Sequence, residues 1–321
     1  MREFAFELAL CAHVERAREA VVSRQLGASV HGSRVIDAVV VEPGPGFGAR
    51  AAITAESIPP LAIESDVGPG RARDPTDAFD CRPERARAIA ERATDVGFFE
   101  SGRQGGQECV RQTARYPDDW FDGILGIENK PDLDRPGALE TQLLTDVELG
   151  LLDGVVLATA SHVTGAHLNR IPEAVGVWAF DPETGEREVI REPSSLPTDG
   201  YGVEVGERRP ARTDVWIVTP EEKARARRRL VERAYGKGWR TYDLPACSRV
   251  APDADGLPYC PWKGRVVRPA TDCGRGCDGH DPADPPPSTA DDLRAERTPW
   301  RPDPEGRQRR QIGLDRFGES G

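Results

Sequence analysis

The sequence predicts an α/β protein in which helices flank a mixed sheet. Three observations predict this class. An amphipathic helical segment opens the chain, runs of β-branched and apolar residues indicate buried strands, and a later stretch repeats the order strand, helix, strand. Alternating elements of this kind are typical of a sheet buried between helices.

The first predicted helix covers residues 3–24, because apolar residues recur there at steps of three and four. The β-branched run Val35–Val41 predicts a buried strand that ends at a cluster of Pro and Gly. Residues 43–115 are expected to form an insertion with one helix at Pro83–Thr94, since proline is favoured at the first position of a helix.

Three more core elements are expected after the insertion: a strand at residues 121–130, a helix at 138–153 and a strand at 154–161. Downstream, the sequence predicts a hairpin around Pro182–Gly185 and, within residues 214–238, a strand that leads into a charged helix. We assign residues 1–245 to one α/β domain.

The charge composition is unusual, with a formal net charge of −11 and only 4 Lys among 43 basic residues. This pattern is typical of proteins from salt-in halophilic archaea, so the acidic surface does not exclude a nucleic-acid partner. No run approaches the roughly 18 apolar residues of a membrane span, and the N-terminus lacks the apolar core of a secretory signal. We expect a cytoplasmic protein without a membrane partner.

The segment GILGIENK contains the most informative pair of residues. Glu128 and Lys130 lie two positions apart at the end of an apolar strand, so both side chains are expected on one face. A carboxylate holds a hard divalent cation such as Mg²⁺, and a neighbouring ammonium positions water and offsets charge on a phosphate. A lysine at this point of an arginine-rich chain indicates a task unsuited to guanidinium.

This arrangement resembles the PD-(D/E)XK, or restriction-endonuclease-like, nuclease superfamily, whose core is a helix, a strand hairpin with Asp then Glu-x-Lys, a helix and a strand. The resemblance implies divalent-metal-dependent hydrolysis of DNA, with Mg²⁺ or Mn²⁺ as the cofactor and a role in DNA repair or defence. The whole chain also resembles an uncharacterised haloarchaeal family. The resemblance implies these site residues: Asp37 and Glu128 as metal ligands, Lys130 as the catalytic lysine, Glu15 or Glu7 as an additional carboxylate, and Gln142 as a polar residue on the following helix.

Two alternatives stay open at this stage. One is a catalytically inactive protein of the same fold that binds nucleic acid or another protein. The other is an S-adenosylmethionine-dependent methyltransferase, because the strand before Glu42 continues into Gly44, Gly46 and Gly48, and such glycines allow a ligand to approach the backbone.

A second group of candidate ligands lies near the C-terminus, in residues 246–280. Cys247, Cys260, Cys273 and Cys277 follow the spacing C-x12-C-x12-C-x3-C, and His280 is near enough in sequence to replace one thiolate. In a reducing compartment this clustering favours a metal over disulfides, and four thiolates suit Zn²⁺ or an iron-sulfur cluster. Residues 281–321 contain few apolar residues, and we expect a disordered tail.

Overall fold

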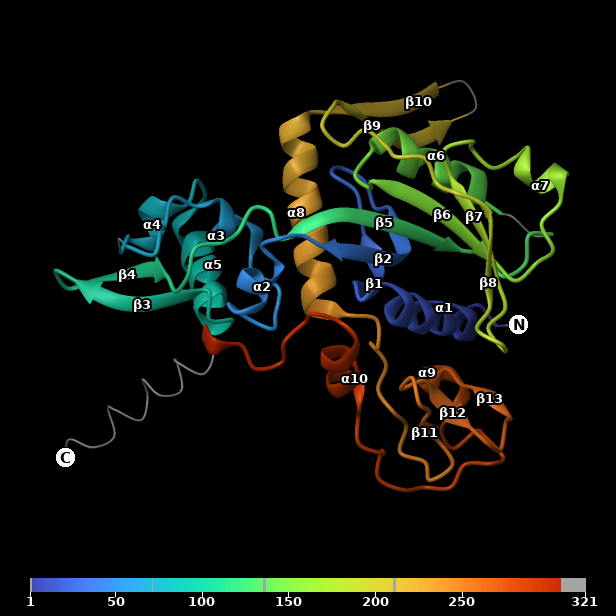
Figure 1. Ribbon diagram of the computed structural model, residues 1–321. Helices are drawn as coiled ribbons and strands as arrows, with labels where there is room; N and C mark the ends of the chain where they lie inside the picture. Colours follow the sequence, from blue (N-terminus) through green and yellow to red (C-terminus); the bar gives the residue numbers. More distant parts are fainter. Residues whose placement is uncertain (1, 71, 135–136, 210–211, 307–321) are drawn as a thin grey trace.

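The computed structural model describes residues 2–70, 72–134, 137–209 and 212–306. Within these residues the centre is a six-stranded sheet in the order β1-β2-β5-β6-β7-β8 (Figure 1). Strand β2 is antiparallel to both of its neighbours, β1 and β5. The next three strands, β5, β6 and β7, are parallel to one another, and β8 is antiparallel to β7. The strands are β1 (Val21–Gly27), β2 (Val35–Pro43), β5 (Phe121–Asn129), β6 (Gly154–Thr159), β7 (Gly176–Phe180) and β8 (Arg187–Arg191). The predicted α/β class with a mixed sheet flanked by helices is confirmed.

The beginning of the chain differs from the prediction. Helix α1 (Glu3–Arg18) ends at Glu19, whose φ of 51° is left-handed, and β1 begins two residues later. The predicted helix over residues 3–24 was therefore wrong after Arg18. The apolar spacing continues to Val21 because helix and strand both bury their apolar residues in the interior, and the β-branched pair Val21–Val22 belongs to the sheet.

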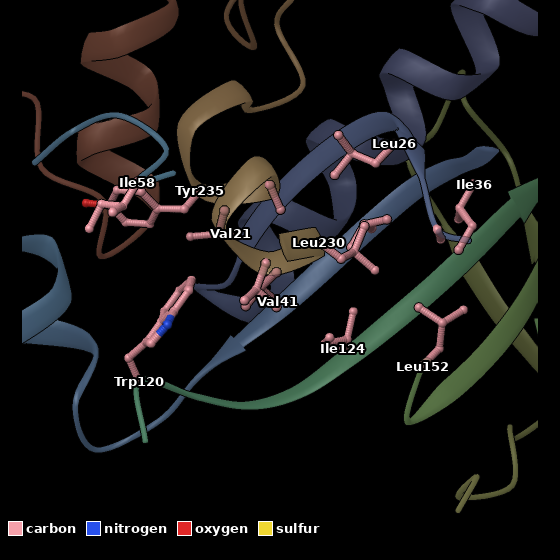
Figure 2. Close-up of a cluster of buried hydrophobic side chains, with 14 of the residues drawn as sticks. Val21, Leu26, Ile36, Val41, Ile58, Trp120, Ile124, Leu152, Leu230 and Tyr235 are labelled. Carbon is pink, nitrogen blue, oxygen red and sulfur yellow. The ribbon is translucent and has the colours of Figure 1, made fainter. Parts of the chain in front are cut away.

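Helices cover both faces of the sheet. On one face α1 packs Phe6, Leu10 and Val14 against apolar side chains of the strands. On the other face lie α6 (Leu139–Leu149) and α8 (Pro220–Lys237). Figure 2 shows the second interface, where Leu230 and Tyr235 of α8 lie among side chains from β1, β2 and β5. The sheet is thus buried between helices.

Residues 44–120 form the insertion between β2 and β5. The helices are α2 (Phe47–Ala51), α3 (Pro60–Glu64), α4 (Pro75–Ala78) and α5 (Pro83–Asp95), and β3 (Phe99–Gln104) pairs with β4 (Gln107–Gln112) in a hairpin. Helix α5 ends one residue after its predicted end. The buried Arg50 guanidinium donates to both carboxylate oxygens of Glu232 on α8, each at 2.6 Å. This ion pair fixes the insertion to the helix that supports the sheet.

A smaller C-terminal part packs below α1 in Figure 1. It contains β11 (Ala251–Pro252), β12 (Pro258–Cys260), β13 (Arg265–Val266), α9 (Pro269–Asp272) and α10 (Ala290–Arg297). The predicted disorder from residue 281 is wrong for residues 281–306, and residues 307–321 lie outside the described part. Few apolar residues suffice here, because the buried Trp300 indole donates to Ala55 O at 3.0 Å and the Arg294 guanidinium stacks over its ring.

The remaining elements are α7 (Gly165–Leu168) and the hairpin of β9 (Gly202–Arg209) and β10 (Arg212–Val218), which leads directly into α8. Among the described residues, no helix combines the length and the apolar character needed to cross a bilayer.

Candidate functional site: an acidic cluster at the end of β2 and β5

Asp37 and Glu128 meet where β2 begins and β5 ends. The paired register of these antiparallel strands runs to Ala38 opposite Ile127, so Asp37 and Glu128 are the next residues along each strand. Asp37 Oδ2 accepts the backbone N–H of Asn129 at 3.0 Å. The structure thus brings together two carboxylates that the long insertion separates in sequence. Asp37 is half-buried, whereas Glu128 is 6% exposed.

Gln25 joins Asp37 to a third carboxylate. Its Nε2 donates to Asp37 Oδ1 at 3.1 Å and to Glu7 Oε1 of α1 at 3.2 Å. The Arg24 guanidinium also donates to Glu7 Oε1, at 3.0 Å. Gln25 has a φ of 53°, a left-handed conformation that is unfavourable for a residue other than glycine. Lys237 Nζ donates to the backbone carbonyls of Arg24 and Gln25, at 2.7 and 2.9 Å, and so supports this turn of the strand.

Arg34, just before β2, links Glu128 to a fourth carboxylate. Its Nη2 donates to Glu128 Oε2 at 2.8 Å and to Asp146 Oδ2 at 2.6 Å, while its Nε donates to Asp146 Oδ1 at 2.8 Å. Asp146 belongs to α6 and is 5% exposed. One guanidinium is therefore shared by two carboxylates, one from a strand and one from a helix.

The cluster carries more negative charge than its own cations offset. It combines the carboxylates of Glu7, Asp37, Glu128 and Asp146 with the guanidinium groups of Arg24 and Arg34. Burial, followed by the charge of Asp37, raises the pKa of Glu128 to about 7. Burial also raises the pKa of Asp37, Glu7 and Asp146, and the charge of Asp37 adds to the rise in the last two. Asp37 is therefore the common electrostatic neighbour of the other three carboxylates.

Three other residues were predicted to belong to the site: Lys130, Gln142 and Glu15. Lys130 directly follows β5, is half-buried, and donates its backbone N–H to Ala158 O at 2.8 Å. Gln142 lies four residues before Asp146 on α6, which places both on one side of that helix. Glu15 is two turns beyond Glu7 on α1, and its carboxylate accepts hydrogen bonds from Trp239 Nε1 (3.0 Å) and Arg240 (2.6 and 3.1 Å). These contacts make Glu15 an anchor for the segment after α8, and Glu7 is the acid of α1 that reaches the cluster.

The sequence did not predict that Arg34, Asp146 and Gln25 belong to the site. Asp146 had a detectable signal, since it falls between Leu143 and Leu149 on the buried side of an amphipathic helix, where an unpaired charge is costly. Arg34 stands in an ordinary polar loop, and the left-handed backbone of Gln25 has no counterpart in the residue pattern.

Within the described ranges, no group of three or more His, Cys, Asp or Glu side chains is arranged as a set of metal ligands. Mg²⁺ requires fewer protein ligands than that, because it is commonly bound by one or two carboxylates and retains several waters. Asp37, which is half-buried, and the buried Glu128 supply two neighbouring carboxylates, and burial is the main cause of their raised pKa values. The donor set fits a hard divalent cation.

The four C-terminal cysteines gather around the three-stranded sheet β11-β12-β13. Cys260 is buried with Val250 and Val267, and Cys273 packs against this group. The backbone of Cys247 pairs with that of Pro282 in an isolated antiparallel β-bridge. Burial, followed by the proximity of Cys260, Cys247 and Cys277, raises the pKa of the Cys273 thiol. All seven cysteines of the chain are free thiols. The four thiols are neighbours, but in the part of the chain that the structure describes they are not arranged as a set of metal ligands, so the metal site at these cysteines stays a prediction.

The glycines after β2 have a structural role. Gly44 donates its N–H to Trp120 O and Gly46 donates to Asp119 O, and a Cβ at either position would lie within 2.5 Å of an Asp119 oxygen. The turn thus packs against the chain entering β5. Because β2 is antiparallel to both neighbours, it is not the parallel strand that precedes a cofactor loop in a doubly wound sheet. The structure therefore lacks the parallel strand that the methyltransferase alternative requires at this loop.

A protein-family model described as a family of unknown function, DUF5787, matches residues 21–282. The match begins at β1 and ends just after the four cysteines, so it includes Asp37, Glu128, Lys130 and Asp146. No curated protein and no solved structure matches the chain.

Proposed function

We propose that this chain, which belongs to the DUF5787 family of unknown function, is a divalent-metal-dependent nuclease that hydrolyses phosphodiester bonds of DNA. The observation that carries the proposal is the meeting of Asp37 and Glu128 at one strand end, in a cluster with excess negative charge. The order α1, β1, β2, β5, α6, β6 supports a restriction-endonuclease-like core, because it repeats helix, hairpin strands, helix, strand around that site.

The residues present have distinct tasks in this proposal. Asp37 and Glu128 would hold Mg²⁺ or Mn²⁺, which supplies a polarised water and offsets charge on the scissile phosphate. Lys130, two residues after Glu128, orients the attacking water and contacts the phosphate. Gln25 and the Asn129 N–H fix the Asp37 carboxylate, and each of its oxygens keeps a lone pair with which it would hold the cation. Gln142 lies one helical turn from Asp146 and remains a candidate for substrate contact.

The test is cleavage of plasmid and linear DNA by the full chain with Mg²⁺ or Mn²⁺ at high salt, the condition that the composition favours. We expect Asp37→Asn, Glu128→Gln and Lys130→Met each to lower the cleavage rate by at least about a hundredfold. Glu42→Gln is the matched control, because Glu42 is an acid of the same strand that pairs with Arg18 away from the cluster. Equal rates for the unaltered chain and all three site variants, with unchanged circular dichroism, would refute the nuclease proposal.

One observation favours a second candidate, a DNA-binding protein of the same fold without catalysis. The Arg34 guanidinium already bonds to Glu128 and Asp146, so it offsets part of the negative charge that a bound metal would otherwise offset. Mn²⁺ titration distinguishes the candidates. An enzyme binds Mn²⁺ through Asp37 and Glu128, whereas the inactive form binds DNA equally with and without the metal.

A further inference from the structure

Helix α8 presents a row of basic side chains at four-residue spacing. Arg225, Arg229, Arg233 and Lys237 are all exposed. Four residues of α-helix advance about 6 Å and turn about 40° beyond a full circle, so these side chains form a slowly winding row along one side of the helix. In Figure 1, α8 stands between the insertion and the sheet, with β10 at one end.

The row has few partners within the protein. The closest recorded carboxylate of Arg225 is Glu64, at 4.0 Å, and Arg233 makes one long bond of 3.4 Å to Gly27 O. Arg229 has no hydrogen bond or ion pair to any part of the chain that the structure describes. By contrast, Arg227 of the same helix is bonded to Leu151 O at 2.7 Å and Asp153 at 2.9 Å. The helix thus carries one arginine that short bonds fix to the protein, and three whose side chains make at most one long polar contact each with the residues that the structure describes.

One end of the row reaches the acidic cluster. Lys237 holds the carbonyls of Arg24 and Gln25, and the side chain of Gln25 bonds to Asp37. Burial and then the nearby charges of Arg24 and Arg233 lower the pKa of Lys237, while Glu7 opposes that shift. Three cations therefore gather beside β1, and a bound anion would relieve their repulsion.

The strand that leads into α8 carries an exposed aromatic residue. Trp216 of β10 is 42% exposed and stands four residues before Pro220, the first residue of α8. Its ring contacts His31 with centroids 5.9 Å apart. An exposed indole offers a surface on which a nucleobase of a bound DNA strand can stack.

We infer that the basic row of α8, Arg225, Arg229, Arg233 and Lys237, binds the phosphate backbone of a DNA strand and directs it to the acidic cluster. The inference rests on the proposed function, since it names the surface that brings substrate to that site. The local concentration of positive charge is notable in a chain whose formal net charge is −11, because overall charge would repel DNA.

The experiment measures binding of fluorescein-labelled single-stranded and duplex DNA to the full chain by anisotropy, with EDTA present, over a series of KCl concentrations at which the protein is folded. The test variant combines Arg225→Gln, Arg229→Gln and Arg233→Gln, and leaves Lys237 to support Gln25. The control variant combines Arg85→Gln, Arg87→Gln and Arg103→Gln, which are exposed arginines of the insertion. Both variants change the net charge equally.

We expect the row variant to raise Kd at least about tenfold and to reduce the slope of log K against log salt by roughly 2, because each phosphate contact contributes about 0.7 on a single strand. The control should change Kd by less than about threefold. Equal weakening in both variants, or no DNA binding by the unaltered chain, would overturn the inference. If the unaltered chain cleaves DNA and the row variant binds DNA as tightly as the unaltered chain, the nuclease proposal stands and the binding surface is wrong. If the row variant binds DNA more weakly than the control but the unaltered chain does not cleave DNA, the binding surface stands and the nuclease proposal is wrong.

Discussion

The Asp37 carboxylate accepts the N–H of Asn129, the residue that directly follows Glu128. This bond lies just past the last paired residues of β2 and β5, where the strand ends leave backbone groups without a ladder partner. An acid that satisfies such a group is fixed in position and still has free lone pairs. The same bond therefore completes the end of the sheet and sets two carboxylates beside each other.

The raised pKa of Glu128 predicts a stability that depends on pH. In the unfolded chain this carboxyl has a pKa of 4.5, against about 7 in the folded protein. The folded state thus retains the proton more strongly, which stabilises it fully below pH 4.5, and this contribution is lost as pH rises through 7. The upper limit of the effect is about 3 kcal/mol. We expect Glu128→Gln to become more stable relative to the unaltered chain between pH 4.5 and 8, as measured by urea unfolding without divalent metal; a pH-independent difference would contradict the assignment.

Arg34 gives a prediction that links stability to metal. Arg34→Gln removes the guanidinium shared by Glu128 and Asp146 and leaves two buried carboxylates unpaired, so the free energy of unfolding at pH 8 should fall by about 3 kcal/mol. Mn²⁺ should restore more stability to this variant than to the unaltered chain, because the cation replaces the lost positive charge. Arg18→Gln, which breaks the more exposed pair with Glu42, should cost less than about 1 kcal/mol and show no Mn²⁺ effect. Thermal unfolding with and without Mn²⁺ measures these differences. An Arg34→Gln variant whose Tm does not change with Mn²⁺ would be evidence against cation binding at the cluster.

The sequence predicted those parts of the fold and site that depend on local pattern. The β-branched run Val35–Val41 identified β2 and with it Asp37, and the apolar strand before Glu128 identified β5. Pattern failed where tertiary contacts decide the structure. Strand β1 was assigned to a helix because Val21 fits both periods, and the segment around Trp300 was assigned to disorder although two large side chains anchor it. The partners that complete the site, Arg34 and Gln25, come from loop and backbone geometry that residue types do not reveal.

The cysteine group predicts a bound metal. The segment from Cys247 to Pro282 buries few apolar side chains of its own, with Val250, Cys260 and Val267 as its separate cluster, and so small a core rarely folds without a metal or a disulfide. We expect purified protein to contain about one zinc ion per chain, or to show a brown iron-sulfur chromophore. Cys260→Ser should lower the metal content, and Cys109→Ser, a buried thiol of the insertion, should not. Metal analysis and visible absorption measure this directly, and colourless protein without metal would refute the prediction.

The left-handed backbone of Gln25 predicts a difference between two substitutions at one position. Gln25→Gly and Gln25→Ala both remove the amide that bonds to Glu7 and Asp37, so both should weaken Mn²⁺ binding at the acidic cluster. Only glycine relieves a φ of 53°, because it has no Cβ to approach the following carbonyl. The glycine variant should therefore be more stable than the alanine variant by about 1 kcal/mol in urea unfolding, while the two bind Mn²⁺ alike. Equal stabilities of the two variants would mean that the strand relaxes once the amide is gone. In that case the side-chain bonds of Gln25, together with the bond from Lys237 Nζ to its carbonyl, impose the left-handed conformation.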